Sequence, residues 1–302
     1  MSRRAANGIT RVIPAVLEAG AVLVLAALLA ACGGSSSGPS SSPSATMSPS
    51  QSASPTASPT LAPSAPTTTA QALYFPREGK LGVAERAVAP STMPATAAVQ
   101  ALLAGPSAGE RAAGLTSVIP TGTTLKSLAL SGNVATVNLS QGPDTTSAAL
   151  LGMPGTAELV YTLTRFATIS GVRVQVGGRP WPSAADAGPS PVTFRRGAFR
   201  GFEPAIFVES PGAGAVLPDP FVLGGTASVY EGSFTAQLTD DSGRRVVRVS
   251  VQASMGAPAR GAFRQTVVYS TSARHGTLTV YSESAEDGSR QNVVEIPVTL
   301  NP

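Results

Sequence analysis

A single cysteine limits how this chain of 302 residues can be held together. Cys32 has no second thiol to pair with, so neither an intramolecular disulfide nor a thiolate metal site is available. Free cysteines are usually buried in cores, but Cys32 stands between an apolar run and a Gly/Ser-rich tract that offers it nothing to pack against. The folded parts must therefore be stabilised by packed apolar cores alone.

The segment before Cys32 has the parts of an export signal. Three arginines form a positive n-region, and an uncharged apolar run of 13 residues follows over 19–31, ending in small residues. A membrane span takes about 20 apolar residues, so this run is short for one. We predict a signal peptide over 1–31. A plain secretory signal and a transmembrane helix are the alternatives.

The quartet Leu29-Ala30-Ala31-Cys32 resembles the bacterial lipobox. The resemblance implies that a diacylglyceryl group is attached to the thiol, and that cleavage then leaves Cys32 as the new N-terminus. Stable anchoring takes two acyl chains, and a diacylglyceryl group supplies both. We therefore expect a lipoprotein that is extracytoplasmic and contacts the cell membrane through the lipid on Cys32.

Residues 33–70 are almost wholly Ser, Pro, Thr, Ala and Gly, and the first charged residue after them is Arg77. Such a segment has too little apolar surface to offset the entropy lost on ordering. We predict a disordered Ser/Pro/Thr linker over 32–71. A flexible coil of this length would average about 35 Å from end to end and would hold the folded part away from the membrane.

The charge balance gives no sign of a nucleic-acid partner. The first 31 residues hold three arginines and one glutamate, so the rest of the chain carries 18 basic and 16 acidic residues. The basic residues are scattered rather than gathered on one stripe. We expect no nucleic-acid binding.

Strand and helix patterns alternate over 72–179. One helix pattern begins after Ser91 or Thr92, either of which is a candidate N-cap, and should end at Gly105-Pro106. A second helix pattern covers 155–168. Strand patterns cover 72–76, 80–89, 125–130, 134–139 and 172–176. Strands with intervening helices predict an α+β domain.

A series of motifs in this module resembles the GerMN domain, in the family's order. The domain is named after a sporulation and germination protein and also occurs in actinobacterial envelope lipoproteins. Residues 150–155 depart from the family pattern by shortening the approach to the second helix. The matching motifs are Tyr74-Phe75-Pro76, Ala101–Pro106, Gly114–Thr123, Ala135–Ser140 and Leu159–Thr164.

Residues 205–302 contain short strand patterns between turn signals, with no helical pattern. Many short strands at this spacing predict an all-β immunoglobulin-like sandwich, here without the inter-sheet disulfide. The patterns cover 206–208, 221–223, 227–230, 234–238, 246–251, 263–269, 276–281 and 292–298.

This second module resembles the immunoglobulin-like domain of bacterial spore germination. The resemblance rests on Ile206–Pro211, Gly225–Ala227, Gly256–Pro258 and Val280–Gly288. That family often follows a GerMN domain. Together the two resemblances imply a role at the cell envelope or spore envelope, with a protein complex or peptidoglycan as the partner.

The segment 180–204 between the modules is rich in Pro, Gly and Arg, and we expect a linker that packs on one module. Its run 195–202 sets two phenylalanines among three arginines, and interfaces draw their energy from such anchors. We predict partner contact at Arg196, Phe199 and Arg200. The alternative is that the phenylalanines clip the two modules together.

For each of the other candidate residues, the sequence allows both a functional role and a purely structural one. Tyr161, Thr164 and Arg165 could line a groove, although Tyr161 also fits a core position. Trp181, the only tryptophan, is either a ligand platform or packing. The turn Asp240-Asp241-Ser242-Gly243 could hold a weak calcium ion, although such turns usually bind none.

No motif for catalysis is present in the sequence. The only histidine, His275, lies in a turn pattern without a nucleophile motif, and there is no HExxH, P-loop or dinucleotide fingerprint. We expect a non-enzymatic binding or scaffold protein with no cofactor and no metal. The alternative is a peptidoglycan hydrolase that uses a carboxylate pair from Glu283, Glu286 and Asp287.

Overall fold

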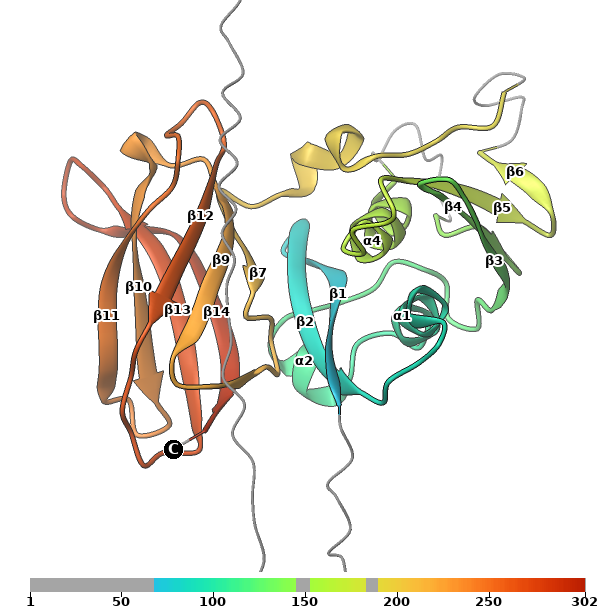
Figure 1. Ribbon diagram of the computed structural model, residues 1–302. Helices are drawn as coiled ribbons and strands as arrows, with labels where there is room; N and C mark the ends of the chain where they lie inside the picture. The colour runs from blue at the N-terminus through green and yellow to red at the C-terminus, as the bar shows by residue number, and fades with distance from the viewer. Residues whose placement is uncertain (1–67, 145–152, 183–189, 302) are drawn as a thin grey trace, which may run out of the picture. The chain divides into compact units, whose positions relative to one another are not determined.

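The computed structural model describes residues 68–144, 153–182 and 190–301 (Figure 1). The predicted signal peptide, Cys32 and almost all of the predicted linker 32–71 lie outside the described residues. No described helix is long and apolar enough to cross a membrane.

The first domain begins with a tight hairpin. Strands β1 (Thr69–Arg77) and β2 (Lys80–Val88) pair antiparallel along their whole length. Glu78 and Gly79 make the turn, both with positive φ, at 52° and 73°. Two-residue turns of this kind match the right-handed twist of the strands, so the turn fixes the register of the pair.

A four-stranded sheet forms the other side of this domain. Its order is β3 (Leu125–Ser131), β4 (Val134–Leu139), β5 (Gly171–Val176) and β6 (Arg179–Trp181). β4 and β5 pair in parallel, and parallel neighbours need a crossover connection. Helix α4 (Pro154–Leu163) lies in that connection and packs against both β1 and β5 (Figure 1).

Two further helices close the domain. α1 (Pro94–Leu103) buries Ala98, Val99 and Leu102, and α2 (Ala108–Ala112) follows directly. Arg86 of β2 ties them together: it donates to the Ala101 and Gly105 carbonyls at 3.0 and 2.8 Å and pairs with Glu110 of α2. The pKa of Glu110 is lowered because Arg86 and Ser107 outweigh the effect of burial.

The second domain is a two-sheet sandwich. One sheet has the order β11-β10-β13-β14-β8 and the other β12-β9-β7. Apolar side chains from both sheets, such as Leu223, Leu238 and Val280, form its core. The strands are β7 (Ile206–Ser210), β8 (Val216–Leu217), β9 (Phe221–Ala227), β10 (Ser233–Asp240), β11 (Arg245–Gln252), β12 (Gly261–Val267), β13 (His275–Glu283) and β14 (Arg290–Leu300).

These elements confirm the predicted fold class of an α+β domain followed by an all-β immunoglobulin-like sandwich. Some boundaries were predicted wrongly. The N-cap of α1 is Met93, which makes no side-chain cap. Ser91 Oγ accepts the N–H of Met93 itself, and this N–H lies before the first helical residue, Pro94, so the bond does not cap the helix. α4 ends at Leu163 rather than at 168. The Thr164 hydroxyl, directly after the helix, donates a hydrogen bond to the Val160 carbonyl.

Differences in the second domain are similarly local. Residues 227–230 form no separate strand: Ala227 ends β9, and Tyr230 opens a short 3-10 turn, η2 (Tyr230–Gly232). His275 is the first residue of β13 rather than part of a turn. The short elements α2, β6 and β8 were not predicted.

The segment expected to be a linker packs onto the first domain. β6 extends the four-stranded sheet, and Phe194 pairs with Val172 through two backbone hydrogen bonds of 2.8 and 2.9 Å. Phe194 and Phe199 are buried in the first core. Phe207 of β7, which follows this segment, is buried in the same core and so ties the second domain to the first.

Candidate functional site

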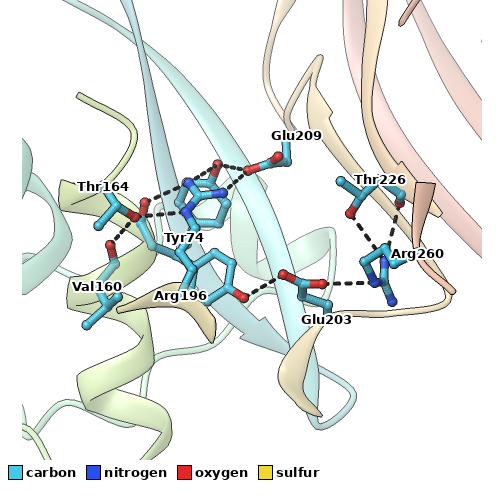
Figure 2. Close-up of polar contacts among 9 residues, drawn as sticks. Tyr74, Val160, Thr164, Arg196, Glu203, Glu209, Thr226 and Arg260 are labelled. Atoms are coloured by element: carbon cyan, nitrogen blue, oxygen red, sulfur yellow. Dashed lines mark hydrogen bonds and ion pairs between the residues drawn. The ribbon is translucent and has the colours of Figure 1, made fainter. Parts of the chain in front are cut away.

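A cluster of charged and aromatic side chains lies where the two domains meet (Figure 2). It is formed by β1, α4, η1 (Arg196–Phe202) and β7. We call it the ionic junction and define it by Tyr74, Tyr161, Thr164, Arg196, Glu203, Glu209 and Arg260. Every one of these side chains contacts another member.

Arg196 is at the centre of the ionic junction. Its guanidinium lies over the rings of Tyr161 and Tyr74, at 4.7 and 5.3 Å from their centroids. Nη1 pairs with Glu209 Oε1 at 2.6 Å, and Nε donates to Thr164 Oγ1 at 2.8 Å. Nη2 donates to the Tyr161 carbonyl at 3.2 Å. Charge-assisted hydrogen bonds and cation–π contacts thus compensate the cation from several sides.

Both tyrosine hydroxyls donate to carboxylates. Tyr74 bonds to Glu209 Oε1 at 2.5 Å, and Tyr161 bonds to Glu203 Oε1 at 2.6 Å. Burial and the neighbouring carboxylates raise the pKa of each tyrosine, so both stay protonated donors. Burial alone would raise the pKa of Glu209, but Arg196 and the Tyr74 hydroxyl hold it below its usual range.

A second ion pair continues the cluster into the sandwich. Glu203 Oε2 lies 2.9 Å from Arg260 Nε, an ion pair that lacks hydrogen-bond geometry. Arg260 also donates to the Pro204 carbonyl at 2.9 Å and to Thr226 Oγ1 of β9 at 3.2 Å. The polar contacts therefore run without a break from α4 of the first domain to β9 of the second (Figure 2).

Apolar and backbone contacts support the ionic junction. The rings of Tyr74, Tyr161 and Phe207 pack together, with centroids 5.5 to 6.0 Å apart. Ala213, in the loop after β7, accepts a backbone bond from Glu85 at 2.9 Å and donates one to Val83 at 2.8 Å. These contacts join the two domains through a shared core and a backbone bridge to β2.

The predicted partner-contact residues have different environments. Arg196 belongs to the ionic junction, and Phe199 is only 3% exposed and stacks near Phe194 and Phe202. Arg200 is exposed. Arg200 is the most exposed of the three, and partner contact at these residues stays a prediction.

The other sequence candidates are drawn into local packing. Tyr161 is fully buried, and Thr164 bonds to Arg196, while Arg165 is exposed. The Trp181 ring is half-buried and packs so closely over Gly142 that an added Cβ there would lie 3.1 Å from it. The structure does not bring Tyr161, Thr164 and Arg165 together as one exposed groove.

Two of the three candidate carboxylates are engaged in surface contacts, and the third, Glu286, is exposed. Glu283 is half-exposed and pairs with Arg248 at 2.8 Å. Asp287 accepts the Ser289 N–H at 3.0 Å. Hydrogen bonds from Ser289 and Ser284 lower the pKa of Asp287. In the turn Asp240-Asp241-Ser242-Gly243, Asp240 accepts bonds from Ser242 and Arg244, so its oxygens are used within the turn. Within 68–144, 153–182 and 190–301, no three metal-ligating side chains gather into a site.

One further ionisable group is buried, away from the ionic junction. Glu158 of α4 is 0% exposed and accepts hydrogen bonds from Ser117 Oγ at 2.8 Å and the Val118 N–H at 2.9 Å. Loss of water on burial raises the pKa of Glu158 to about 8, with a smaller contribution from Asp144. Glu158 is therefore mostly protonated in the folded chain at neutral pH.

We predict that Glu158 makes the stability of the fold depend on pH. Between the ordinary pKa of 4.5 and the folded value of about 8, the folded state holds a proton that the unfolded state has lost, so stability falls as pH rises. From pH 5.5 to 7.5 this loss amounts to about 2–3 kcal/mol. In Glu158→Gln, whose amide can make the same two contacts, it should be absent. Urea unfolding at both pH values measures it.

The control for this prediction is Glu295→Gln, which changes an exposed carboxylate of β14. It should keep the wild-type difference between pH 5.5 and 7.5. If Glu158→Gln and the wild type lose stability equally over this range, Glu158 is already ionised in the folded chain.

Some solved structures are similar to this chain at low identity. The tandem GerMN domains of the sporulation protein GerM from Bacillus subtilis match with 16% identity over 61% of this chain and 60% of that one, at a TM-score of 0.35. The first GerMN domain of the same protein matches with 18% identity over 43% and 99%, at 0.34. A putative lipoprotein from Clostridium perfringens matches with 22% identity over 36% and 75%, at 0.25. This chain thus spans three fifths of the first structure.

Family models match both folded parts, whereas no curated protein matches the chain. Residues 72–181 match the Germane family, described as sporulation and spore germination. Residues 205–289 match the Gmad2 family, described as the immunoglobulin-like domain of bacterial spore germination. The chain therefore carries a GerMN-type domain followed by an immunoglobulin-like domain of the bacterial spore-germination family.

Proposed function

We propose that this chain is a lipid-anchored protein of the bacterial envelope whose two domains act as one rigid, non-catalytic binding or scaffold unit. The observation that carries the proposal is the ionic junction. Arg196 and Glu209 form a partly buried pair between the domains, with Arg196 stacked on tyrosines that also contact Phe207. A polar network whose charged members are paired in this way favours one arrangement over others. A surface built from both domains would then keep its shape, as a scaffold requires.

The sequence around Cys32 supports the lipid anchor, and the Ser/Pro/Thr-rich segment after it would be the spacer. Both matched families are named for sporulation or spore germination, which supports a role in the envelope during those processes. The partner we propose is an envelope protein complex or peptidoglycan.

The buried ionisable groups are used for structure, and this supports a binding role over catalysis. The charged groups of the ionic junction neutralise one another, and both tyrosine hydroxyls donate to carboxylates. In the rival hypothesis, a peptidoglycan hydrolase, Glu283 would act as acid or base, yet Glu283 is half-exposed and paired with Arg248. A general acid needs a carboxyl group with a raised pKa, and burial is the usual source of that shift.

Incubating the full chain in detergent with peptidoglycan fragments and with solubilised envelope proteins tests the proposal. Saturable binding to either, with no change in the fragments by mass spectrometry, is the expected result. Steady release of cleaved fragments would overturn the non-catalytic role. The variant Glu283→Gln/Glu286→Gln is the matched control, because a hydrolase using these carboxylates would lose its turnover while a binding protein would be unchanged.

A further inference from the structure

One edge of β1 is covered only in part. The Tyr74 N–H donates to Thr162 Oγ1 at 3.2 Å, and the Pro76 carbonyl accepts the Thr116 N–H at 2.8 Å. Backbone groups in an antiparallel pair alternate in direction, so the even-numbered residues of β1 face away from β2. Ala70 and Ala72 belong to the same set, and no described residue hydrogen-bonds to their N–H or carbonyl groups.

The uncovered end of β1 lies in a groove of about 470 Å³. A groove of this volume is within the range of small-ligand sites. Its walls are the start of α1, the end of β2, the residues that follow α4, Ser210 of β7 and Glu85, whose carboxylate accepts the Gly212 N–H at 3.2 Å. Small and apolar side chains dominate: Ala70, Ala72, Val88, Pro94, Ala97 and Phe166.

Two polar side chains in the groove have unused hydrogen-bonding capacity. Arg165 is exposed and forms no ion pair or side-chain hydrogen bond with a described residue. Gln71 is only 8% exposed, and its Nε2 donates to the Pro94 carbonyl at 3.4 Å. Its Oε1 is buried and receives no hydrogen bond within the described part of the chain. Buried amide oxygens normally have a donor.

We propose that this groove binds an extended segment of a partner protein, which adds as a strand to the open edge of β1 and places a carboxylate near Arg165. Ala70 and Ala72 together offer two donors and two acceptors, so the added strand can form four backbone hydrogen bonds. Main-chain bonds give affinity in this mode of recognition, and side-chain pockets give specificity. The small side chains of the groove leave room for the added backbone, and Arg165 supplies the charge that selects an acidic residue or a C-terminal carboxylate.

Unpaired strand edges are usually protected by a proline or a charge on the strand itself. In β1 the only proline is Pro76, at the end that Thr116 already covers. The stretch from Thr69 to Phe75 carries neither a charge nor a proline. The open end of β1 is therefore suited to pairing with another chain. This proposal rests on the proposed binding role and names the class of partner.

The probe for the test is a library of random ten-residue peptides with free C-termini, presented to the full chain in detergent. Selected peptides should share an acidic group at a fixed position. Ala72→Pro removes one outward N–H and fills the edge, and it removes no bond to β2. Arg165→Glu reverses the selecting charge. Each should weaken binding at least tenfold, whereas Arg179→Glu, an exposed arginine of β6, should leave it unchanged.

Hydrogen exchange gives a second readout, which also serves if Ala72→Pro fails to fold. A bound peptide should slow exchange at the Ala70 and Ala72 amides of the wild type. The proposal is overturned if no peptide is enriched over a blank selection, if Arg165→Glu binds as the wild type does, or if only peptidoglycan fragments protect these amides. None of these outcomes bears on the lipid anchor at Cys32, which is tested separately.

Discussion

Replacing Arg196 with alanine is expected to destabilise the fold by about 2–4 kcal/mol, somewhat less than removing one partner of a fully buried ion pair, because the Arg196 side chain is 29% exposed. Glu209, whose side chain is 15% exposed, would lose its counter-charge, and the rings of Tyr74 and Tyr161 would lose the cation between them. Thr164 Oγ1 and the Tyr161 carbonyl would lose a donor as well. Urea unfolding of the full chain at pH 7 measures the change.

Two further variants separate this effect from a general loss of charge. Arg195→Ala removes the neighbouring arginine, which is exposed and makes only a 3.3 Å contact with Ser170, so a change within about 0.5 kcal/mol is expected. Arg196→Met/Glu209→Gln removes both charges and should recover much of the lost stability. If Arg196→Ala is as stable as Arg195→Ala, the pair of Arg196 and Glu209 does not hold the domains together. The hypothesis of partner contact at Arg196 predicts that outcome, together with weaker capture of a partner.

Replacing Cys32 with serine is expected to abolish lipidation of the chain completely. The thiol is the proposed site of the lipid, and hydroxyl oxygen cannot take its place in the thioether. Without the two acyl chains the stable anchor is lost. Cys32→Ser should be unlipidated and either released or left uncleaved at this site; cell fractionation separates these two outcomes, and the wild type should stay with the membranes.

Mass spectrometry of the peptide that contains Cys32 gives the direct readout. The wild type should carry a diacylglyceryl group, alone or with an added N-acyl chain, and Ser35→Ala should be processed in the same way. An unmodified thiol on the mature wild-type chain would contradict the anchor.

Periodic elements were predictable from the sequence because their signals are local. The alternation in 172–176 is visible without any partner, as is the helical spacing of Ala98, Val99 and Leu102. α2 could also have been found. Ser107 and Glu110 form a capping box, whose spacing of Ser and Glu marks a helix start. β8, with two residues, is too short to show a period.

The ionic junction could be predicted only in part. The run 195–202 stood out because it mixes arginines with aromatics outside any periodic element, and these side chains do form contacts. Their partners are in the same chain, which the pattern cannot show. Tyr74 and Glu209 are 135 residues apart, and a lone glutamate in a strand carries no sign of a distant tyrosine.

The central claim is that the two domains form one rigid unit, and an interdomain distance measurement tests it most directly. Spin labels on cysteines at Leu130 of β3 and Val268 after β12, both exposed, would report the distance in a chain with Cys32→Ser. We predict one narrow distance distribution, which Arg196→Ala broadens. A broad distribution without the Arg196 substitution would mean that the domains move independently, and would contradict the account.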